Sequence, residues 1–291
     1  MRVSAFNSVG GSAEMIRRVA EHLSRNLVFW RRLPSHVGRE LVLVSPDASL
    51  KFWKRDLYKS EPRLFDWAEE FVRRGDVVWD IGANVGLFAF SAASLSGTEG
   101  HIVAVEADNW LAQLLVRSAS MLTSKCAGVD VFPLAVINSV GVGMFNIAAR
   151  GRSTNYLDGA RGSTQTGGIR KSVMVETVTL DWLLTRSPVP NILKIDVEGA
   201  EYQVLKGAHQ VLSQVRPLII CEVSSENAVR VGELLRSYGY ELFDLDKSKN
   251  ARRPLSVPSF NTLARFKGSS DESATLFKHS IHTKAGVGLS V

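Results

Sequence analysis

The sequence predicts an α/β fold: a mostly parallel, seven-stranded sheet covered by helices on both faces. Three observations predict it. Short apolar runs alternate with helical patterns from residue 76 onward, and a glycine-rich turn joins the first strand to the first helix of that alternation. The last two strand-like runs have no helix between them, which indicates an antiparallel edge strand. A helix and a β-hairpin are expected to form an N-terminal extension before this sheet.

The N-terminal extension is predicted over residues 1–75, beginning with an unstructured leader at 1–12. Apolar residues recur at helical spacing over 13–30, with arginines elsewhere on the wheel. Such an amphipathic helix packs on its own domain or on a second subunit, or lies on a membrane surface. Residues 40–44 and 49–53 read as the two strands of the hairpin. A further helix is expected over 61–71.

The domain predicted over residues 76–267 carries the alternation. Its expected strands cover residues 77–81, 102–106, 129–133, 192–197, 218–223, 241–244 and 260–266. Its expected helices cover residues 85–96, 109–122, 200–212 and 227–237. Residues 138–180 interrupt the pattern with strand-like runs at 143–148 and 173–178, and their Gly-, Ser- and Thr-rich middle is expected to lie as a loop over the ligand edge. The polar residues 268–291 read as a disordered tail.

Cysteine content and hydropathy place limits on the class of protein. Cys126 and Cys221 are the two cysteines, in no metal-binding spacing, which predicts no disulfide framework or zinc site and fits a reducing compartment. The sequence shows no apolar core of a signal peptide and no run of membrane-spanning length. We therefore expect a cytoplasmic protein.

The formal net charge of +6 is unevenly distributed. Residues 1–75 and 247–291 carry the positive excess, whereas residues 76–246 are acidic overall. Basic flanks can attract an acidic acceptor, such as a nucleotide sugar or a lipid-linked glycan, or a membrane surface; they can also be solvated chain ends. No basic stripe with interleaved aromatic residues is present, so nucleic-acid binding is not expected. The sequence also leaves open whether the protein forms a homodimer.

The turn Gly82-Ala83-Asn84-Val85-Gly86 follows the first strand of the alternation. Gly82 and Gly86 allow a sharp bend and a close approach to a ligand. A strand, a glycine turn and a helix N-terminus form a nucleotide-type site at the carboxyl edge of an open sheet. Asp80 stands just before the turn, where it would repel a pyrophosphate. This favours a ligand with a cationic centre, such as S-adenosylmethionine.

Glu106 ends the second strand of the alternation, at the position where an acid can accept hydrogen bonds from both ribose hydroxyls of an adenosine. Alone it could be a solvated strand-end residue, but with the glycine turn it forms a specific pattern. The adenine is expected against residues 134–136, including Ala135, with hydrogen bonds mainly from the backbone.

Asp196, Glu198 and Glu201 crowd the end of a strand and the start of a helix, close to Lys194. Acids complement a helix N-terminus, and one of them can be a cap. Three are more than capping needs. Repulsion among them would raise the proton affinity of one, which suits a general base; alternatively, Asp196 and Glu198 could hold a divalent cation. Lys194 is expected to point into a polar pocket or to bridge to an acid, and Glu222 could bind acceptor hydroxyls from the same edge.

Residues 78–86 (VWDIGANVG), 105–107 (VEA) and 193–202 (LKIDVEGAEY) together resemble the FkbM family of S-adenosylmethionine-dependent methyltransferases. The segments TLDW at 179–182 and ICEV at 220–223 are similar to that family as well. The resemblance implies a class I methyltransferase fold and O-methylation of a hydroxyl on a sugar, a glycan or a polyketide-like secondary metabolite. It implies cofactor binding by Asp80, Gly82, Ala83, Asn84, Gly86, Glu106 and Ala107, and places Asp196, Glu198 and Glu201 beside the transferred methyl group.

Two alternatives to a methyltransferase are left open. A Rossmann-type NAD oxidoreductase fits the fold, although it expects Gly-x-Gly-x-x-Gly where this chain has Gly82-x-x-x-Gly86. A subunit that binds the cofactor without catalysis also fits, although the intact acidic cluster speaks against it.

Overall fold

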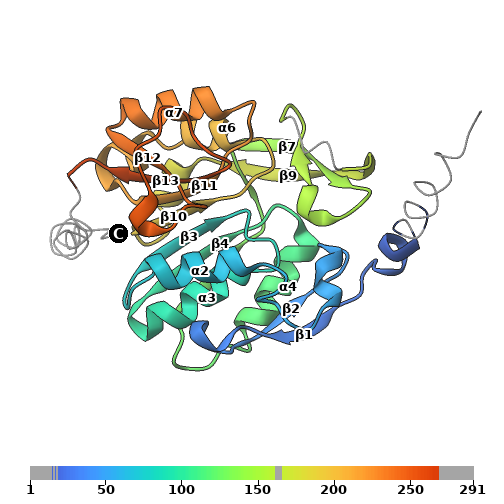
Figure 1. Ribbon diagram of the computed structural model, residues 1–291. Helices are drawn as coiled ribbons and strands as arrows, with labels where there is room; N and C mark the ends of the chain where they lie inside the picture. Colours follow the sequence, from blue (N-terminus) through green and yellow to red (C-terminus); the bar gives the residue numbers. More distant parts are fainter. Residues whose placement is uncertain (1–14, 16, 18, 161–165, 269–291) are drawn as a thin grey trace, which may run out of the picture.

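A seven-stranded sheet forms the centre of the computed structural model, which describes residues 15, 17, 19–160 and 166–268 (Figure 1). Its strands are β3 (Val77–Ile81), β4 (His101–Val105), β5 (Gly128–Phe132), β10 (Ile192–Ile195), β11 (Leu218–Glu222), β12 (Tyr240–Asp244) and β13 (Asn261–Phe266). The strand order is β12-β13-β11-β10-β3-β4-β5. The pairs from β11 to β5 are parallel, and β13 is antiparallel to both of its neighbours. The predicted mostly parallel sheet is confirmed, with its antiparallel strand one place inside the edge.

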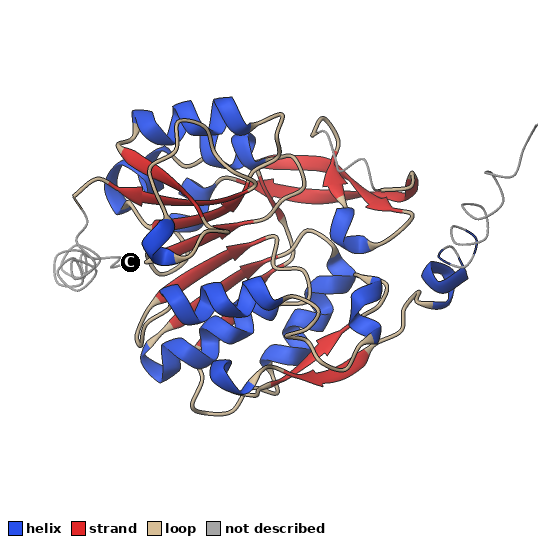
Figure 2. Cartoon of the chain, in the orientation of Figure 1, coloured by secondary structure: helices blue, strands red, loops and turns tan. Residues whose placement is uncertain are grey.

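Helices cover both faces of this sheet (Figures 1 and 2). One face carries α2 (Pro62–Phe71), α3 (Leu87–Ser96) and α4 (Asn109–Ala119), and the other carries α5 (Leu180–Leu184), α6 (Glu201–Lys206) and α7 (Ala228–Ser237). Successive side chains of β3 enter different cores, because side chains alternate across a strand. Val78 packs in the core under α2 and α3, and Trp79 packs in the opposite core. This burial on both faces explains the continuous apolar run of β3.

A second sheet is built by the insertion after β5. It consists of β6 (Ala135–Val136), β7 (Gly141–Ala148), β8 (Tyr156–Leu157) and β9 (Ile169–Val178), in the order β6-β9-β7-β8. The long antiparallel pair of β7 and β9 extends from the end of the main sheet (Figure 1). Both strand-like runs predicted in the insertion are therefore confirmed as strands. Residues 161–165 of the predicted loop lie outside the described residues.

The N-terminal hairpin differs from the prediction. Strand β1 (Phe29–Arg32) pairs antiparallel with β2 (Leu41–Val44), and the predicted strand at 49–53 is the short helix η2 (Leu50–Trp53). The prediction was wrong because Ser45 already starts a tight turn: its carbonyl accepts hydrogen bonds from the amides of Ala48 and Ser49. The chain cannot turn into a returning strand, and one helical turn instead buries Phe52.

The predicted helix at 13–30 is shorter than expected. Residues 15, 17 and 19–23 are helical, whereas Phe29 and Trp30, at the end of the predicted helix, already belong to the strand β1. Residues 13, 14, 16 and 18 lie outside the described part of the chain, as do the predicted leader and residues 269–291 of the predicted tail.

The predicted helix at 200–212 is also interrupted. It splits at Gly207, where a Cβ would come within 2.5 Å of the Ile137 carbonyl oxygen. Its second half is the π-helical turn η5 (Val211–Val215). The remaining short helices are η1 (Ser35–Val37), η3 (Gly97–Glu99), η4 (Arg152–Thr154) and η6 (Lys249–Ala251). None of the described helices combines the length and the apolar character that crossing a lipid bilayer requires.

A buried ion-pair network ties the extension to the insertion. Arg152 Nε lies 2.9 Å from Asp47 Oδ2, and Arg152 Nη1 lies 2.6 Å from Asp108 Oδ2. Arg170 Nη1 lies 2.9 Å from Asp47 Oδ1. Asp47 precedes η2, Asp108 caps α4, and the two arginines belong to the insertion. The network therefore holds the extension, the end of β4 and the insertion in one arrangement.

We predict that Asp47→Asn lowers the free energy of unfolding by about 3 kcal/mol, because it removes the carboxylate that pairs with the partly buried Arg170 and one of the two carboxylates that pair with Arg152. Urea unfolding monitored by circular dichroism measures this loss. The matched control is Glu99→Gln, which removes an exposed ion pair with Arg74 and should cost at most about 0.5 kcal/mol. Equal losses in the two variants would show that the network does not stabilise the fold.

Candidate functional site

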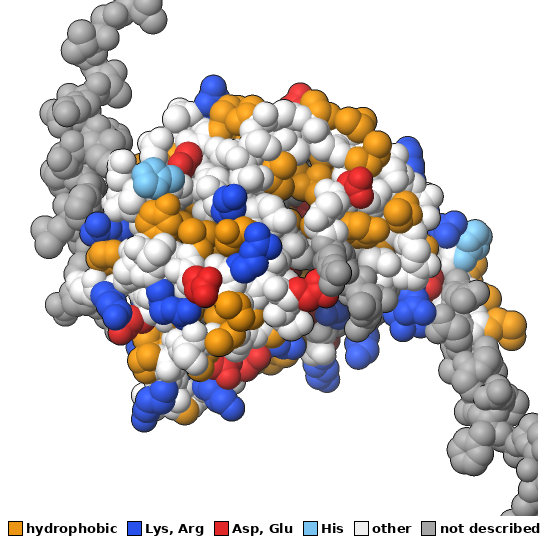
Figure 3. Space-filling model, turned by 90° about the horizontal axis from the view of Figure 1, so that it is seen from above, with side chains coloured by type: hydrophobic (Ala, Val, Ile, Leu, Met, Phe, Trp, Pro, Cys, Tyr) orange, Lys and Arg blue, Asp and Glu red, His pale blue; other side chains and the backbone are white. Residues whose placement is uncertain are grey.

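A cavity of about 560 Å³ opens at the carboxyl ends of the parallel strands. Strands β3, β4, β10 and β11 each contribute residues to its lining, at the sheet edge where nucleotide-type ligands bind in open α/β sheets. Residues of the insertion and of the N-terminal extension complete the walls. On the outer face shown in Figure 3, acidic and basic side chains are interspersed with apolar ones rather than gathered by sign.

The predicted glycine turn forms one wall of this cavity. Gly82 and Gly86 have φ values of 81° and 82°, and Asn84 has a φ of 54°. A Cβ on Gly82 would lie 1.9 Å from the Asp196 carbonyl oxygen. The positive φ values agree with the expectation, but the close approach at Gly82 is to the backbone after β10 and not to a ligand. Glycine at this position therefore lets the ends of β3 and β10 pack together.

Glu106 lies in the cavity wall next to the glycine turn. Its Oε2 accepts a hydrogen bond of 2.8 Å from the Asn84 amide, and its Oε1 accepts one of 2.8 Å from the Asp108 amide. Burial raises the pKa of Glu106 to about 7, against the effect of these two hydrogen bonds. Ala107 and Ala135 line the cavity beside it. The structure thus brings the residues predicted for the adenosine end together.

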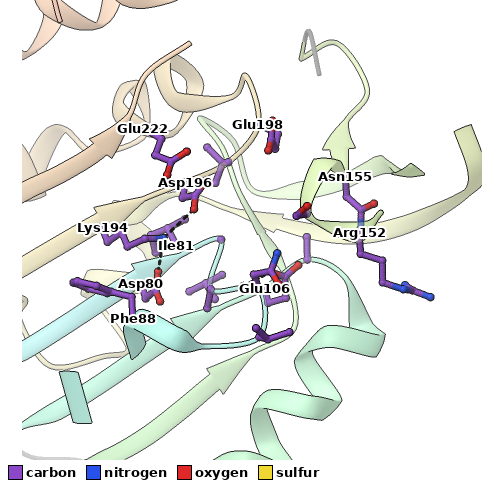
Figure 4. Close-up of a pocket in the computed structure, with 18 of the residues that line it drawn as sticks. Asp80, Ile81, Phe88, Glu106, Arg152, Asn155, Lys194, Asp196, Glu198 and Glu222 are labelled. Atoms are coloured by element: carbon purple, nitrogen blue, oxygen red, sulfur yellow. Dashed lines mark hydrogen bonds and ion pairs between the residues drawn. The ribbon is translucent and has the colours of Figure 1, made fainter. Parts of the chain in front are cut away.

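Lys194 bridges two carboxylates at the base of the cavity (Figure 4). Its Nζ lies 3.1 Å from Asp80 Oδ1 and 3.2 Å from Asp196 Oδ2. The side chains of Lys194 and Asp80 are only 3% and 1% exposed. Burial alone would lower the pKa of Lys194, but the neighbouring carboxylates raise it above its ordinary value. Of the two expected orientations, Lys194 thus shows both: it lines the cavity and it bridges to acids.

Two polar atoms in this wall are left without a partner. Asp80 Oδ2 and Asn84 Oδ1 are buried, and no described residue forms a hydrogen bond with either of them. Both residues line the cavity. Because a buried acceptor without a partner is costly, these two atoms point to a ligand that donates hydrogen bonds.

Glu198 and Glu222 line the cavity beside Asp196 (Figure 4). Burial, followed by the charges of Asp196, Glu222 and Glu201, raises the pKa of Glu198 to about 8. Burial and the charge of Asp196 likewise raise the pKa of Glu222 to about 7. The cavity therefore holds carboxylates that can take up a proton near neutral pH.

Glu201 does not share this cavity with Asp196 and Glu198. Its carboxylate is buried and accepts hydrogen bonds from the Gly199 amide at 2.7 Å, from Asn227 Nδ2 at 2.7 Å and from Ser224 Oγ at 3.1 Å. These bonds fix the turn that carries Glu198 onto α7. The Glu201 carboxylate therefore holds this turn in place, and its charge helps to raise the pKa of Glu198.

The cavity lining also contains residues that the sequence patterns did not indicate. Lys51 and Glu61 come from the extension, Arg63 from the first turn of α2, and Phe260 from the residue before β13. Arg152 lines the cavity at the insertion side. No local motif marks these residues, since their place depends on how the extension packs on the sheet.

The expected alternative of a divalent-cation site at Asp196 and Glu198 finds no support. Among the residues that the structure describes, no three His, Cys, Asp or Glu side chains are grouped so that they could hold a metal ion. The Lys194 ammonium contacts Asp196 and lies where a metal ion bound to that carboxylate would have to lie.

Comparison with known proteins identifies the family. Residues 80–242 match the model of the methyltransferase FkbM domain, which is more than half of the chain. A relative in Haloferax volcanii, the hexuronic acid methyltransferase AglP, is 28% identical over 178 residues, which cover 58% of this chain and 65% of AglP. The match thus spans slightly less than two thirds of that relative's length.

Solved structures of methyltransferases are also similar. The methyltransferase FkbM from Methylobacillus flagellatus KT has a TM-score of 0.40 and 11% identity, covering 87% of this chain and 60% of that chain. A precorrin-6y C5,15-methyltransferase from Geobacter metallireducens has a TM-score of 0.40 and 10% identity, covering 71% of this chain and 84% of that one.

The family match bears on the first of the two alternatives left open by the sequence. It begins at Asp80 and covers the glycine turn, Glu106 and the acidic segment after β10. A dinucleotide oxidoreductase is therefore not supported. This chain belongs to the FkbM family of methyltransferases, and its sheet with helices on both faces is a class I methyltransferase fold.

Proposed function

We propose that the chain is an S-adenosylmethionine-dependent O-methyltransferase that acts on a hydroxyl of a sugar or glycan. The observation that carries this proposal is the separation of two ends in one cavity: a nucleoside-type end at Glu106 and a cluster of carboxylates at Asp196, Glu198 and Glu222. The relative AglP is a hexuronic acid methyltransferase, which supports a sugar as the acceptor.

The residues of the adenosine end fit the cofactor. Each carboxylate oxygen of Glu106 accepts one backbone amide and retains a lone pair that can accept a ribose hydroxyl. Ala107 and Ala135 supply small apolar side chains for the adenine. Asp80 Oδ2 and Asn84 Oδ1, which lack partners among the described residues, can accept hydrogen bonds from the cationic amino-acid end.

Glu198 is the general base in this proposal. The bound cofactor supplies an electrophilic methyl group on a sulfonium. As the acceptor oxygen bonded to that methyl carbon and displaced the sulfur, the Glu198 carboxylate would take up the hydroxyl proton. Asp196 is held in an ion pair with Lys194, whereas the raised pKa of Glu198 suits proton uptake near neutral pH.

Lys194 and Glu201 are positioning residues in this proposal, and Glu222 binds the acceptor. Lys194 holds Asp80 and Asp196 in place, and Glu201 holds the turn that carries Glu198. Glu222 lines the cavity next to Asp196 and can accept a hydrogen bond from an acceptor hydroxyl. Much of the rate acceleration would then come from alignment of the reacting atoms.

Transfer of a labelled methyl group from S-adenosylmethionine into purified sugars and glycans tests this function. Label in an ether-linked methyl group of a sugar is the expected result. A protein that binds S-adenosylhomocysteine but transfers no label to any sugar would instead be the non-catalytic subunit, and label on nitrogen or carbon would refute O-methylation.

We predict that Glu106→Gln weakens S-adenosylhomocysteine binding by about 10- to 100-fold, because the amide loses hydrogen bonds that a charged group makes. Isothermal titration calorimetry measures the dissociation constant. Glu99→Gln, at an exposed site before β4, should bind as the unmodified protein does. Unchanged binding in Glu106→Gln would remove Glu106 from the adenosine site.

We predict that Glu198→Gln lowers kcat by about 10²- to 10⁴-fold, because the proton acceptor is lost. In the unmodified protein kcat/KM should rise with pH and level off above about 8, where Glu198 is ionised. In the variant this rise should disappear. Glu233→Gln, an exposed acid on α7, serves as the control. A variant that keeps the full rate and the same pH profile would show that another group takes the proton.

A stability measurement checks the Glu198 pKa without any acceptor. A carboxyl whose pKa is raised in the folded state binds more protons there than in the unfolded chain, so stability falls as pH rises from about 4.5 to about 8. Glu198→Gln should therefore be more stable than the unmodified protein at pH 8, and this gain should vanish at pH 4. A gain that is the same at both pH values would contradict the raised pKa.

A further inference from the structure

The acceptor end of the cavity is bounded by the N-terminal extension, which precedes the residues matched by the family model. Helix η2 contributes Lys51, and the start of α2 contributes Glu61 and Arg63 to the lining. This wall therefore comes from a different part of the chain than the proposed adenosine end and the carboxylate cluster. It is where recognition of a particular acceptor can be built.

Each cation of this wall has one acidic partner. Lys51 Nζ forms an ion pair with Glu61 Oε1, and Arg63 Nη1 lies 3.4 Å from Asp246 Oδ1, which is outside the cavity lining. Lys51 and Arg63 themselves both line the cavity. The side chains of Lys51 and Arg63 are 42% and 56% exposed, so both are accessible to a ligand.

These two cations line the same cavity as the carboxylate cluster. The charges of Glu222 and Asp196 act on Lys51, and those of Lys51 and Arg63 act on Glu222. An acceptor that offers a hydroxyl to Glu198 or Glu222 would therefore bring its other substituents to Lys51 and Arg63. Phe260, which is 59% exposed, adds an apolar ring to the same lining.

We propose that Lys51 and Arg63 form a subsite that binds the carboxylate of an acidic sugar, and so select a uronic acid over the neutral sugar. The inference rests on the proposed function, in which the acceptor is a sugar. A guanidinium binds a carboxylate through two parallel hydrogen bonds, and an ammonium adds a point charge. Asp196, Glu198 and Glu222 line the same cavity and repel an anion, so they disfavour a phosphate dianion more strongly than a monoanionic carboxylate.

Titration of the protein saturated with S-adenosylhomocysteine tests this subsite. The probes are methyl β-D-glucuronoside, methyl β-D-glucoside and glucose 6-phosphate, with binding followed by ligand-observed NMR. The glucuronoside should bind about fivefold or more tightly than the glucoside, and also more tightly than the phosphate. Lys51→Met and Arg63→Met should each weaken glucuronoside binding by about fivefold and leave glucoside binding unchanged.

Two further variants test whether the loss of glucuronoside binding is specific to Lys51 and Arg63. Lys59→Met removes an exposed lysine of the same segment that does not line the cavity, and it should leave all three affinities unchanged. Arg63→Lys keeps the charge and should retain part of the preference for the glucuronoside. Because the exchanged side chains are exposed, unchanged circular dichroism is expected for every variant.

The outcomes separate this inference from the proposed function. Equal binding of acidic and neutral sugars, binding of none of them, or a preference that survives both substitutions would overturn the subsite. Tighter binding of glucose 6-phosphate would overturn its assignment to a carboxylate. Failure of S-adenosylhomocysteine to bind at all would instead refute the proposed function.

Discussion

The arrangement of the cavity depends on the buried Lys194 ammonium between Asp80 and Asp196. The contact with Asp80, at 3.1 Å, joins β10 to the neighbouring strand β3, and the contact with Asp196, at 3.2 Å, holds the residue that follows β10. A buried ammonium is costly unless carboxylates surround it, and the same holds for the buried carboxylate of Asp80. The three groups are therefore interdependent. They determine where the glycine turn, the free oxygen of Asp80 and the segment that carries Glu198 lie.

The cavity has two ends that come from different parts of the chain. The proposed adenosine end is built within the family domain, by the glycine turn and Glu106. The proposed acceptor end combines the carboxylates that follow β10 and end β11 with Lys51 and Arg63 of the extension. The network of Asp47, Asp108, Arg152 and Arg170 holds the extension and the insertion on the domain, close to both ends. A change in the extension can thus alter acceptor recognition while the cofactor end stays the same.

The fold and the position of Asp80 and Glu106 in one cavity were predictable because they depend on local patterns. Alternating apolar runs identify the parallel strands, and residues that follow parallel strands meet at one edge of the sheet. Asp80 and Glu106 therefore came together as expected. Glu201 was harder, because its direction depends on hydrogen bonds to Ser224 and Asn227, which lie more than 20 residues away in the sequence. The same limit applies to Lys51, whose place in the cavity follows from a turn at Ser45 that the strand prediction missed.

A crystal structure of the protein with bound S-adenosylhomocysteine tests the central claim most directly. The ribose hydroxyls should lie on Glu106, and the sulfur should face the space between Asp196 and Glu198, with Lys51 and Arg63 left free for the acceptor. A ligand bound in the reverse direction, with its adenosine at Lys51 and Arg63, would contradict this account, as would a ligand bound outside the cavity.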